Sequence, residues 1–447
     1  MSLIELPYQA DISERFSHFN QFAWSMLFDS CQQERFDWFS GLPTKTITLN
    51  SDTPLLEQIY NDEQTLIQSN EIQQDIFDYL NGFEYQDTHP NTIPFTGGWL
   101  GYLSYDLGQQ RILNKTSNKT RAFNTPLAQL GFYDWACIND HQLKKSYLWF
   151  NCSEYKQFKI ESIFNTVKAN NKKQLPEFHW QALTEKTDYI SNIQRILDYI
   201  INGDCYQTNY TQCWETNTDN LDTLALYQSR KRKCPTPFSG FITTPELTLS
   251  CHSPEAFIQI KDSQVNTFPI KGTIKRSTDP IEDALLKSQL ASSEKDRAEN
   301  IMITDLLRND LSITAKTGSV KCPEICKVHS YSNVHHLVSQ VSSVLDEKKF
   351  TLMDVVKHSF PGGSITGAPK KRAMQIIDEL EDQSRSLYCG SMIALSQNKQ
   401  LHSNILIRSF IYHNNQLRCY AGGGIVMESI AENEYQESLS KVSILKF

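Results

Sequence analysis

The sequence predicts an α+β protein with largely antiparallel sheets and helices on their outer faces. Two observations support this class. The chain has 447 residues, of which 39% are hydrophobic and 21% charged, so it can bury a full core as an ordinary globular protein does. Its strand patterns come in runs and so do its helical patterns, whereas a parallel sheet would require strands and helices to alternate one by one.

Net charge and the N-terminal segment argue against several classes of protein. The chain has 43 Lys and Arg against 51 Asp and Glu, a net charge of −8, whereas nucleic-acid and anionic-membrane binders need a basic surface. The N-terminus, MSLIELPYQADISERF, lacks the basic and apolar parts of a signal peptide. No apolar run approaches the ~18 residues that span a bilayer. We therefore expect a cytoplasmic protein that binds neither nucleic acid nor membrane.

The chain divides into two regions, which we expect to form one intertwined body. Residues 1–165 contain short apolar strands bounded by glycine, for example at 97–102 and 131–136. Residues 165–187 are polar and rich in Lys, Gln and Asn, which is typical of a connector. Residues 187–447 carry the clearer strand and helix patterns.

The second region begins with an amphipathic helix. Tyr189, Ile193 and Ile196 recur at helical spacing, and Asn202-Gly203 ends the pattern. A later helix begins at Asp279-Pro280, because proline is favoured in a first turn. The expected helices are 187–201, 280–290, 293–311, 350–358, 369–381 and one from about 430. The expected strands are 205–214, 246–260, 264–270, 391–396, 404–412 and 416–421.

A lysine at the end of an expected strand is the first candidate catalytic residue. The segment Phe268-Pro269-Ile270-Lys271-Gly272-Thr273 runs from a strand into a turn, and Gly272 allows a ligand to approach the backbone. An amine with an ordinary pKa of about 10.4 is almost entirely protonated at pH 7. A nucleophilic Lys271 therefore requires a buried, electropositive site that lowers this pKa. A solvated loop lysine would show the same sequence pattern.

Two pairs of acidic residues lie at i,i+3 spacing on expected helices. Asp296 and Glu299 form the first pair, and Glu299 shares its helix row with Met302, which places it on the inward face. Glu434 and Glu437 form the second pair. Four carboxylates at one site would repel each other unless a cation bound, and an all-oxygen set suits Mg²⁺. Two solvated helix faces are the alternative, because spacing does not show that the pairs meet.

Two glycine-rich segments have the composition of anion-binding loops. Residues 361–370, PGGSITGAPK, lead directly into a helix, and residues 421–425, AGGGI, follow a strand. Free backbone N–H groups in such segments bind carboxylates and phosphates. Neither segment is a Walker A loop or a dinucleotide-binding fingerprint. Tight turns would give the same pattern.

Three further residues are candidates for binding or proton transfer. Arg408 shares an apolar strand face with Leu406 and Phe410, and an arginine in such a place often pairs with a carboxylate, which could equally be a structural one. His336 follows Val334 and His335, and a core histidine would fit there as well. Glu255 lies just past a strand and is either a general acid or a surface residue.

Together these segments resemble the chorismate-utilising enzymes, most closely the members that aminate chorismate at C4. They occur in the family's order across roughly residues 187–447, as Ser253-Pro254-Glu255, Pro269 to Thr273, Asp296 to Asn300, His336 to Ser339, Pro361 to Lys370, Arg408, Ala421 to Gly424, and Glu434 to Glu437. Each segment is weak alone, but the set is specific. Residues 24–27 and 105–108 match more loosely.

The resemblance implies both a fold and a reaction. The fold is two antiparallel sheets packed as a sandwich, with helices outside and the active site in the C-terminal part. The reaction is the Mg²⁺-dependent replacement of the C4 hydroxyl of chorismate by ammonia, which gives 4-amino-4-deoxychorismate for folate synthesis.

The resemblance also implies roles for individual residues. Lys271 attacks C2 of chorismate to form a covalent intermediate, and Glu255 protonates the departing C4 oxygen. The other implied roles are metal binding by Glu299 and Glu434 with support from Asp296 and Glu437, carboxylate binding by Arg408, Gly423 and Gly424, and further substrate contacts by Thr273, His336 and Thr366.

Other activities of the same family are alternatives. Anthranilate synthase component I typically has a small residue at the position of Lys271. Isochorismate and salicylate synthases use a lysine base near the position of Gln207, and the missing lysine weighs against water as the nucleophile. A non-catalytic chorismate-binding regulatory protein is an alternative of another class, although the presence of Glu255 and Lys271 together with the acidic pairs counts against it.

The source of ammonia implies a partner. The sequence has no Gly-Xaa-Cys-Xaa-Gly elbow to supply a glutaminase nucleophile. The resemblance therefore implies a separate glutamine amidotransferase subunit. In related anthranilate enzymes, an N-terminal sheet region binds a tryptophan effector near the segment that matches Trp24 to Ser30. Tryptophan binding to this chain is an open hypothesis.

Overall fold

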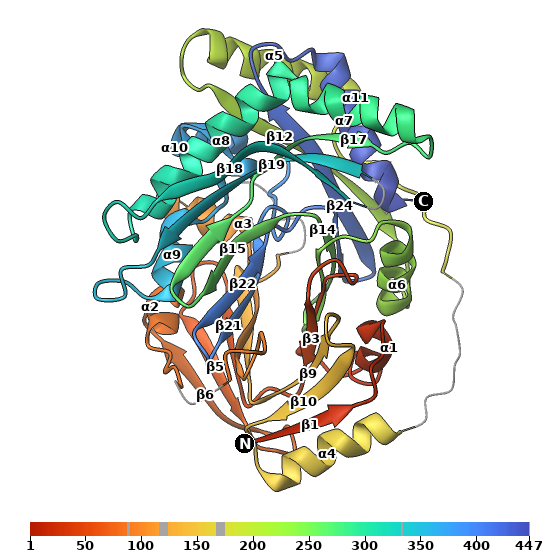
Figure 1. Ribbon diagram of the computed structural model, residues 1–447, viewed down its shortest axis with the longest axis vertical. Helices are drawn as coiled ribbons and strands as arrows, with labels where there is room; N and C mark the ends of the chain where they lie inside the picture. The colour runs from red at the N-terminus through yellow and green to blue at the C-terminus, as the bar shows by residue number, and fades with distance from the viewer. Residues whose placement is uncertain (87–89, 116–123, 167–174, 332–333, 447) are drawn as a thin grey trace.

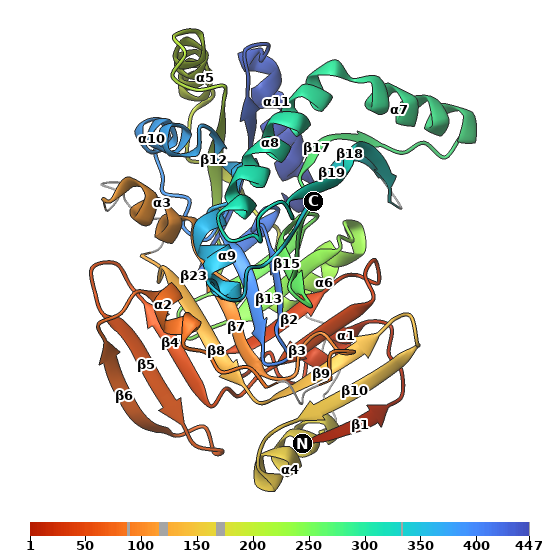
Figure 2. The same cartoon turned by 60° about the vertical axis from the view of Figure 1, so that its left-hand side comes forward.

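The computed structural model describes residues 1–86, 90–115, 124–166, 175–331 and 334–446. Within them, the strands form two antiparallel sheets of twelve strands each. The sheets face each other, and the helices lie around them (Figure 1, Figure 2). This confirms the predicted α+β class with two mostly antiparallel sheets packed as a sandwich.

The first sheet is built from strands of both regions of the chain. In order across the sheet these are β1 (Ser2–Leu6), β10 (Lys145–Phe150), β9 (Trp135–Asp140), β3 (Phe36–Ser40), β2 (Ser25–Asp29), β13 (Phe238–Thr243), β14 (Thr248–Ser253), β23 (Ser409–His413), β24 (Gln416–Ile425), β12 (Gln207–Asn217) and β11 (Gln181–Ala182), with β20 (Gly367–Ala368) also paired to β12.

The second sheet is mixed in the same way. Its order is β17 (Ile270–Lys275), β19 (Val334–Val344), β16 (Gln264–Thr267), β15 (Ala256–Lys261), β22 (Gln400–Asn404), β21 (Ser391–Ser396), β7 (Gly98–Leu103), β8 (Ala128–Tyr133), β4 (Lys45–Leu49), β5 (Leu55–Tyr60) and β6 (Leu66–Ile72), with β18 (Lys321–Ser330) paired to β19. The two regions therefore meet within each sheet, through β2–β13 in the first and β21–β7 in the second.

The helices lie mainly at the edges and ends of the sandwich. They are α1 (Ile12–Phe16), α2 (Ile76–Asn81), α3 (Tyr105–Leu113), α4 (Glu154–Asn165), α5 (Lys186–Ile201), α6 (Thr223–Lys233), α7 (Pro280–Ser292), α8 (Glu294–Ser312), α9 (Leu352–Ser359), α10 (Lys370–Leu380) and α11 (Ala431–Lys446), with the short 3₁₀ helix η1 (Gly363–Ile365). No helix among the described residues is both long and apolar enough to cross a bilayer.

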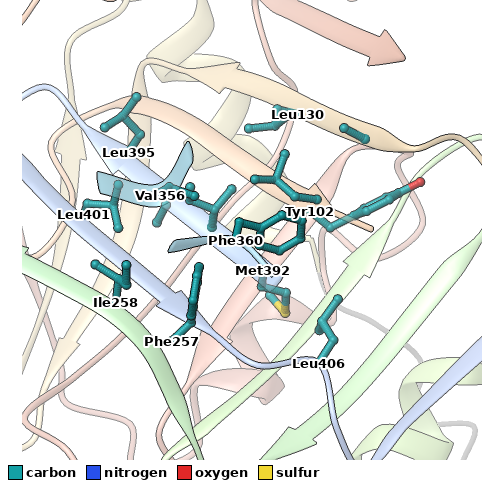
Figure 3. Close-up of a cluster of buried hydrophobic side chains, with 14 of the residues drawn as sticks. Tyr102, Leu130, Phe257, Ile258, Val356, Phe360, Met392, Leu395, Leu401 and Leu406 are labelled. Carbon is teal, nitrogen blue, oxygen red and sulfur yellow. The ribbon is translucent and has the colours of Figure 1, made fainter. Parts of the chain in front are cut away.

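The main core lies between the two sheets. It joins Met26 and Ile242 of the first sheet to Leu100 and Ile393 of the second. Figure 3 shows part of it, where Phe360 lies among side chains of the second sheet. Because both inner faces are apolar, burial holds the sheets together and leaves polar side chains at their ends.

Two expected strands are wrong because each is a pair of strands in different sheets. Residues 246–260 form β14 in the first sheet and β15 in the second, separated by Pro254 and Glu255. Residues 404–412 form β22 and β23, separated by residues 405–408, where Arg408 has a left-handed φ of 52°. The apolar pattern continues through both crossings because the linking residues are buried or half-buried as well.

The two crossings lie side by side and are hydrogen-bonded to each other. The backbone N–H of Ile405 donates to the carbonyl of Glu255 at 3.1 Å, and that of His252 donates to the carbonyl of Arg408 at 3.1 Å. The strands on either side of the two crossings are paired, since β14 pairs with β23 in the first sheet and β15 pairs with β22 in the second. Glu255 and Arg408 therefore both lie at the junction between the two sheets.

Other expected boundaries differ by small amounts. The strand expected at 131–136 is the junction of β8 and β9, which turn at Asp134. The strand expected at 264–270 ends at Thr267, and Pro269 separates it from β17. The expected helices agree with α5, α7, α8, α9, α10 and α11 to within about two residues, apart from boundary fraying. In the expected connector, residues 167–174 lie outside the described residues.

Candidate active site

A cavity of about 850 Å³ opens between the ends of the two sheets. Its wall contains side chains from strands, crossings and helices that are distant in the sequence. Of the residues predicted to form the site, the wall contains Glu255, Lys271, Thr273, Asp296, Glu299, His336, Arg408, Gly423, Gly424, Glu434 and Glu437. A cavity of this volume is in the range of small-molecule sites.

Lys271 lies within β17 and not beyond a strand end as expected. A register irregularity between Lys271 and Thr273 interrupts the pairing with β19 at Gly272, whose φ is 77°. Bulges of this kind redirect a neighbouring side chain. The amine of Lys271 pairs with Glu299 Oε1 at 2.6 Å, and each side chain is only 12% exposed. A solvated loop position is thereby excluded.

The first acidic pair lies at the start of α8. Ser293 caps the helix and also donates its hydroxyl to Asp296 Oδ2 at 2.6 Å. Asp296 packs beneath the bulge, since a Cβ at Gly272 would lie 2.9 Å from its carboxyl carbon. Glu299, one turn later, accepts from Gln207 Nε2 at 2.8 Å as well as from Lys271. Glu299 therefore points farther into the cavity, and Asp296 supports the helix start.

The second acidic pair lies at the start of α11. Glu434 is 5% exposed and accepts a hydrogen bond from Ser429 Oγ at 2.7 Å. Burial raises the pKa of Glu434, and the nearby Glu437 acts in the same direction. For Glu437, burial also raises the pKa, but its ion pair with Lys441 at 2.6 Å helps bring the net value below the ordinary one.

Glu299 of the first acidic pair and both members of the second pair lie beside the glycine segment of β24. A Cβ at Gly423 would lie 3.3 Å from both Glu434 Oε2 and Glu437 Oε1. A Cβ at the adjacent Gly424 would lie 2.7 Å from Glu299 Oε1. Carboxylates from α8 and α11 are therefore brought together at one end of the cavity, and glycine leaves the space that they occupy.

This end of the cavity fits a hard cation that takes few protein ligands. Among the described residues, no three His, Cys, Asp or Glu side chains form a ready-made metal site. Mg²⁺ commonly uses only one or two carboxylates and completes its shell with water and ligand oxygens. Glu299 and Glu434 provide such a pair, and lysines accompany both, since Lys295 Nζ lies 3.7 Å from Glu434 Oε1. The donor set is compatible with Mg²⁺.

Glu255 is held as an acid that is protonated near neutral pH. Burial raises the pKa of its carboxyl from the ordinary 4.5 to about 7, although a hydrogen bond from Ser364 and the charge of Lys271 both oppose this shift. A carboxyl in this range can donate a proton at physiological pH.

Arg408 adds a positive charge to the cavity wall, and His336 lines the same cavity. Arg408 makes no ion pair with any described carboxylate, and its Nη1 contacts Cys234 Sγ at 3.8 Å. An unpaired guanidinium in a cavity wall is suited to an anionic ligand. Burial and the charge of Arg408 lower the pKa of His336 to about 4, so its ring is neutral and shares a 2.7 Å hydrogen bond with Thr273 Oγ1.

The structure does not bring Thr366 to the cavity. Its side chain is fully buried and donates to the carbonyl of Gly362 at 3.0 Å, whereas the neighbouring Ser364 and Ile365 form the wall. The family resemblance implied a substrate contact for Thr366, which here follows directly after η1 and faces its backbone.

Several residues of the wall were missed by sequence reasoning. Lys441 is four residues after Glu437, and this spacing on a helix was a usable signal. Tyr388 and Tyr420 stack with ring centroids 5.1 Å apart, a contact that no local pattern indicates.

A second cavity of about 180 Å³ lies beside β2. Its wall includes Phe28, Asp29 and Ser30, within the segment where a tryptophan effector was considered, together with Trp38 and His402. Trp24 itself is not part of this wall. Aromatic and polar side chains therefore meet in a small separate pocket.

Comparisons with known proteins agree with this geometry. Residues 26–446 match the family described as chorismate binding enzyme. A relative from Klebsiella aerogenes named aminodeoxychorismate synthase component 1 is 37% identical over 99% of this chain and 97% of its own. A relative from Saccharolobus solfataricus named anthranilate synthase component 1 is 34% identical over 84% of this chain and 86% of its own.

A solved structure agrees as well. The crystal structure of anthranilate synthase component I from Streptococcus pneumoniae TIGR4 aligns with a TM-score of 0.81 and 26% identity, and the alignment covers 92% of each chain. The fold and nearly the whole length of the sequence thus correspond to one family. The chain belongs to the family of chorismate binding enzymes.

Proposed function

We propose that the protein is the chorismate-aminating component of an aminodeoxychorismate synthase, which replaces the C4 hydroxyl of chorismate with ammonia for folate synthesis. The observation that carries the proposal is Lys271, a largely buried amine in the same cavity wall as Glu255, whose pKa burial raises to about 7. Sequence identity alone does not separate this activity from anthranilate synthesis, because relatives with the two names are 37% and 34% identical.

The proposed reaction has two displacement steps. The neutral amine of Lys271 forms a bond to C2 of chorismate, the ring double bonds shift, and the C4 oxygen leaves with the proton of Glu255 as water. Ammonia then bonds to C4, the double bonds shift back, and the C2–N bond to Lys271 breaks. The surplus proton of the ammonium intermediate returns to Glu255. Covalent catalysis of this kind replaces one difficult displacement with two easier ones.

The carboxylates of the substrate are assigned to opposite ends of the cavity. Arg408, free of any ion pair with a described carboxylate, binds one of them together with the backbone at Gly423 and Gly424. Thr273 and the neutral ring of His336 contact the substrate between the two ends.

Mg²⁺ is the proposed cofactor. Glu299 and Glu434 would hold it, with Asp296 and Glu437 as outer support. When bound, Mg²⁺ supplies Lewis-acid stabilisation of charge on the ring carboxylate of chorismate. Lys271 is paired with Glu299 and must leave this carboxylate before its amine can attack. Metal binding by Glu299 would remove the ion-pair partner of Lys271.

A glutamine amidotransferase subunit is the proposed source of ammonia, and the cytoplasm the proposed location. Support comes from the name component 1 of the relative, which implies a second component, and from the missing glutaminase elbow. For the second cavity we propose an amino-acid effector such as tryptophan, because Trp38 and Phe28 offer aromatic faces to a ligand.

The alternatives make different products. Anthranilate synthesis is the strongest alternative, since a relative and a solved structure carry that name. In the proposed mechanism, however, Lys271 would occupy the space at C2 that ammonia needs for anthranilate synthesis. Isochorismate synthesis lacks support at Gln207, which binds Glu299 through its amide and offers no basic amine. A non-catalytic binding protein would have no need of Glu255 held as an acid.

The test is to incubate the purified chain with chorismate, ammonium and Mg²⁺ and to identify the product by mass spectrometry after chromatography. We expect 4-amino-4-deoxychorismate, and chelation of the metal should abolish it. Anthranilate, isochorismate or complete silence would each contradict the proposal. Adding the amidotransferase subunit should allow glutamine to replace ammonium. Calorimetry with tryptophan tests the second cavity, and no heat of binding would remove that assignment.

A further inference from the structure

A buried ion pair lies directly behind the wall of the active-site cavity. Arg385 is 1% exposed and Glu381 is 5% exposed, and neither contributes to the wall. The guanidinium binds the carboxylate through two hydrogen bonds, from Nε at 2.9 Å and from Nη2 at 2.7 Å. The pair closes α10 and lies over the ring of Tyr105, whose centroid is 4.8 Å from Arg385 Cζ.

The remaining donors of Arg385 hold two backbone carbonyls that belong to cavity-wall residues. Nη1 donates to the carbonyl of Ile365 at 2.8 Å, and Nη2 donates to that of Asn209 at 3.2 Å. Glu381 in turn accepts from the backbone N–H of Thr211 at 2.9 Å and from its hydroxyl at 2.8 Å. The guanidinium therefore ties η1 to β12 through one hydrogen bond to each, and Glu381 adds two further bonds to β12.

The η1 segment is what supports the general acid. The backbone N–H of Asn209 donates to the carbonyl of Thr366 at 2.9 Å, and its amide side chain donates to the carbonyl of Ser364 at 3.1 Å. Ser364 is 7% exposed and lines the cavity together with Glu255, and its hydroxyl favours the ionised form of that carboxyl. The position of Ser364 relative to Glu255 therefore depends on how η1 lies against β12.

The energetics favour a positioning role over a purely stabilising one. Replacing a buried ion pair by well-packed apolar residues is often neutral or stabilising, because the desolvation of both charges is costly. A guanidinium, by contrast, offers several donors in a rigid plane and can fix two backbone segments at once. An apolar side chain at 385 would fill the same volume without that constraint.

We propose that the Glu381–Arg385 pair is a positioning device for catalysis, which holds Ser364 against Glu255 by tying η1 to β12. The role is assigned on the basis of the proposed amination. Arg385 and Glu381 are positioning residues, because they reach the reacting atoms only through Ser364 and Glu255.

The effect of losing the Ser364 contact on the pKa of Glu255 depends on the charged and titratable groups that face this carboxyl. Lys271 faces it from β17, and its charge favours the carboxylate form of Glu255. Cys389 faces it from the turn before β21, and the pKa of this thiol is raised to about 12, mainly by burial, so the thiol is neutral. Ser364 is the hydrogen-bond donor, and it also favours the carboxylate. Weakening the Ser364 contact should therefore raise the pKa of Glu255 further.

The test compares the pH dependence of kcat for Ser364→Ala and Arg385→Lys with that of the wild type. Lysine keeps the charge beside Glu381 but cannot hold both carbonyls. Because the protonated acid persists to higher pH, the falling limb of kcat should move to higher pH in both variants. We expect kcat at low pH to fall by about tenfold in Arg385→Lys, since small displacements are costly in catalysis, with little change in KM for chorismate.

A matched control separates positioning from stability. Lys156 is 1% exposed and pairs with Asp134 at 2.6 Å, in a buried ion pair that contributes to neither cavity. Lys156→Gln should lower the melting temperature as Arg385→Lys does, but should retain the wild-type pH profile. The double variant Ser364→Ala/Arg385→Lys should shift the limb no farther than Ser364→Ala alone, because both changes remove one contact.

Three results would overturn the inference. Ser364→Ala with a wild-type limb would show that the serine does not act on Glu255. A shift in Ser364→Ala but none in folded Arg385→Lys, or in Glu381→Gln should the lysine variant fail to fold, would show that the pair does not act through the serine. Equal shifts in the Lys156→Gln control would show a general loss of packing. The product formed by the wild type tests the proposed function separately, since the limb can be followed on any chorismate-derived product.

Discussion

Two ionisable side chains in the cavity are held in unlike states by their surroundings. Glu255 lies at a crossing between the sheets, where burial keeps its carboxyl protonated up to about pH 7. Lys271 lies beside Glu299 and is held there by an ion pair. A proton donor and an amine held in an ion pair thus lie in the same cavity wall. Neither state depends on chemistry at the residue itself, because both follow from neighbours on other elements.

Lys271 is the residue at which the choice of product is tested. Lys271→Ala should lose most of the 4-amino product, because no other described amine in the wall is as buried beside the acids. The space left at C2 should allow some ammonia to enter there, so a small amount of the 2-amino isomer should form. Chromatography of the products with ammonium as substrate measures both. An unchanged rate of 4-amino product would remove Lys271 from the mechanism.

The raised pKa of Glu255 should make the folded protein less stable relative to the unfolded chain as the pH rises to neutral and above. In the unfolded chain its carboxyl ionises near the ordinary 4.5, whereas in the folded protein it ionises near 7. As the pH rises from about 4 to 7, the unfolded state alone releases this proton, so the folded protein loses stability across that window. The full effect is about 3 kcal/mol, as an order of magnitude.

Glu255→Gln should therefore gain stability while it loses activity. The amide does not ionise, so the variant should be more stable than the wild type by up to about 3 kcal/mol at pH 8, and little different at pH 4. Loss of the general acid should lower kcat by about 10²–10⁴-fold. Urea unfolding at the two pH values measures the first effect. Equal differences at both pH values would show that ionisation of Glu255 is not the cause.

At the scale of elements, interruptions of regular structure create the site. A bulge at Gly272 turns the β17 side chains, and two crossings place Glu255 and Arg408 next to each other. The glycine segment of β24 leaves room for carboxylates from α8 and α11. Regular strands would have filled each of these places with side chains or paired backbone.

The glycines of β24 allow a graded test of this packing. Gly424→Ala would place a Cβ 2.1 Å from Gln207 Nε2 and 2.7 Å from Glu299 Oε1, so these side chains must move. We expect Mg²⁺ to be bound roughly 10–100-fold more weakly, since groups that orient metal ligands have effects of that size. Gly423→Ala is the matched control, with its nearest contacts at 3.3 Å, and should have a much smaller effect. Titration of activity with Mg²⁺ measures both, and equal effects would contradict this account.

At the scale of the whole molecule, an acidic protein has to admit an anionic substrate. The net charge is −8, yet the cavity mouth carries lysines, among them Lys233 from α6 and Lys275 from β17. Both are exposed, and neither makes an ion pair within the described part of the chain. Unpaired cations at a mouth attract an anion over about a Debye length.

Salt should therefore weaken chorismate capture. The double variant Lys233→Gln/Lys275→Gln should lower kcat/KM by about tenfold at low ionic strength, and the difference should vanish near 1 M salt because the charges are then screened. Lys321→Gln is the control, as an exposed lysine of β18 outside the cavity wall. Initial rates across a salt series measure the effect. A salt-independent deficit would indicate direct contact and not long-range attraction.

Local patterns were sufficient for much of the fold. The helices were predicted to within a few residues because capping residues such as Ser293 and the proline after Asp279 act within one turn. The strands were less reliable. A buried crossing looks like a continued strand, as at 246–260 and 404–412, although Pro254 was a usable warning in the first case.

The candidate site was predicted in parts. Lys271, Glu299 and Glu434 were recognised from short segments and from a family resemblance, but their convergence was only a hypothesis at that stage. Thr366 was implied only by the family resemblance, and its side chain lies behind the part of the wall that Ser364 and Ile365 form. Arg385 was not recognised, because an arginine that faces inward behind a wall has the same spacing as one that faces solvent.

The sequence by itself determined the α+β class and most helix limits, because these follow from spacing and composition within short segments, and its motifs resembled those of one family. Only the tertiary structure decided that acids of α8 and α11 share one end of a cavity, that Arg408 has no described carboxylate partner, and that Glu255 is protonated near pH 7. The reason is physical: burial and charge at a side chain are set by elements far away in the chain, and local spacing carries no information about them.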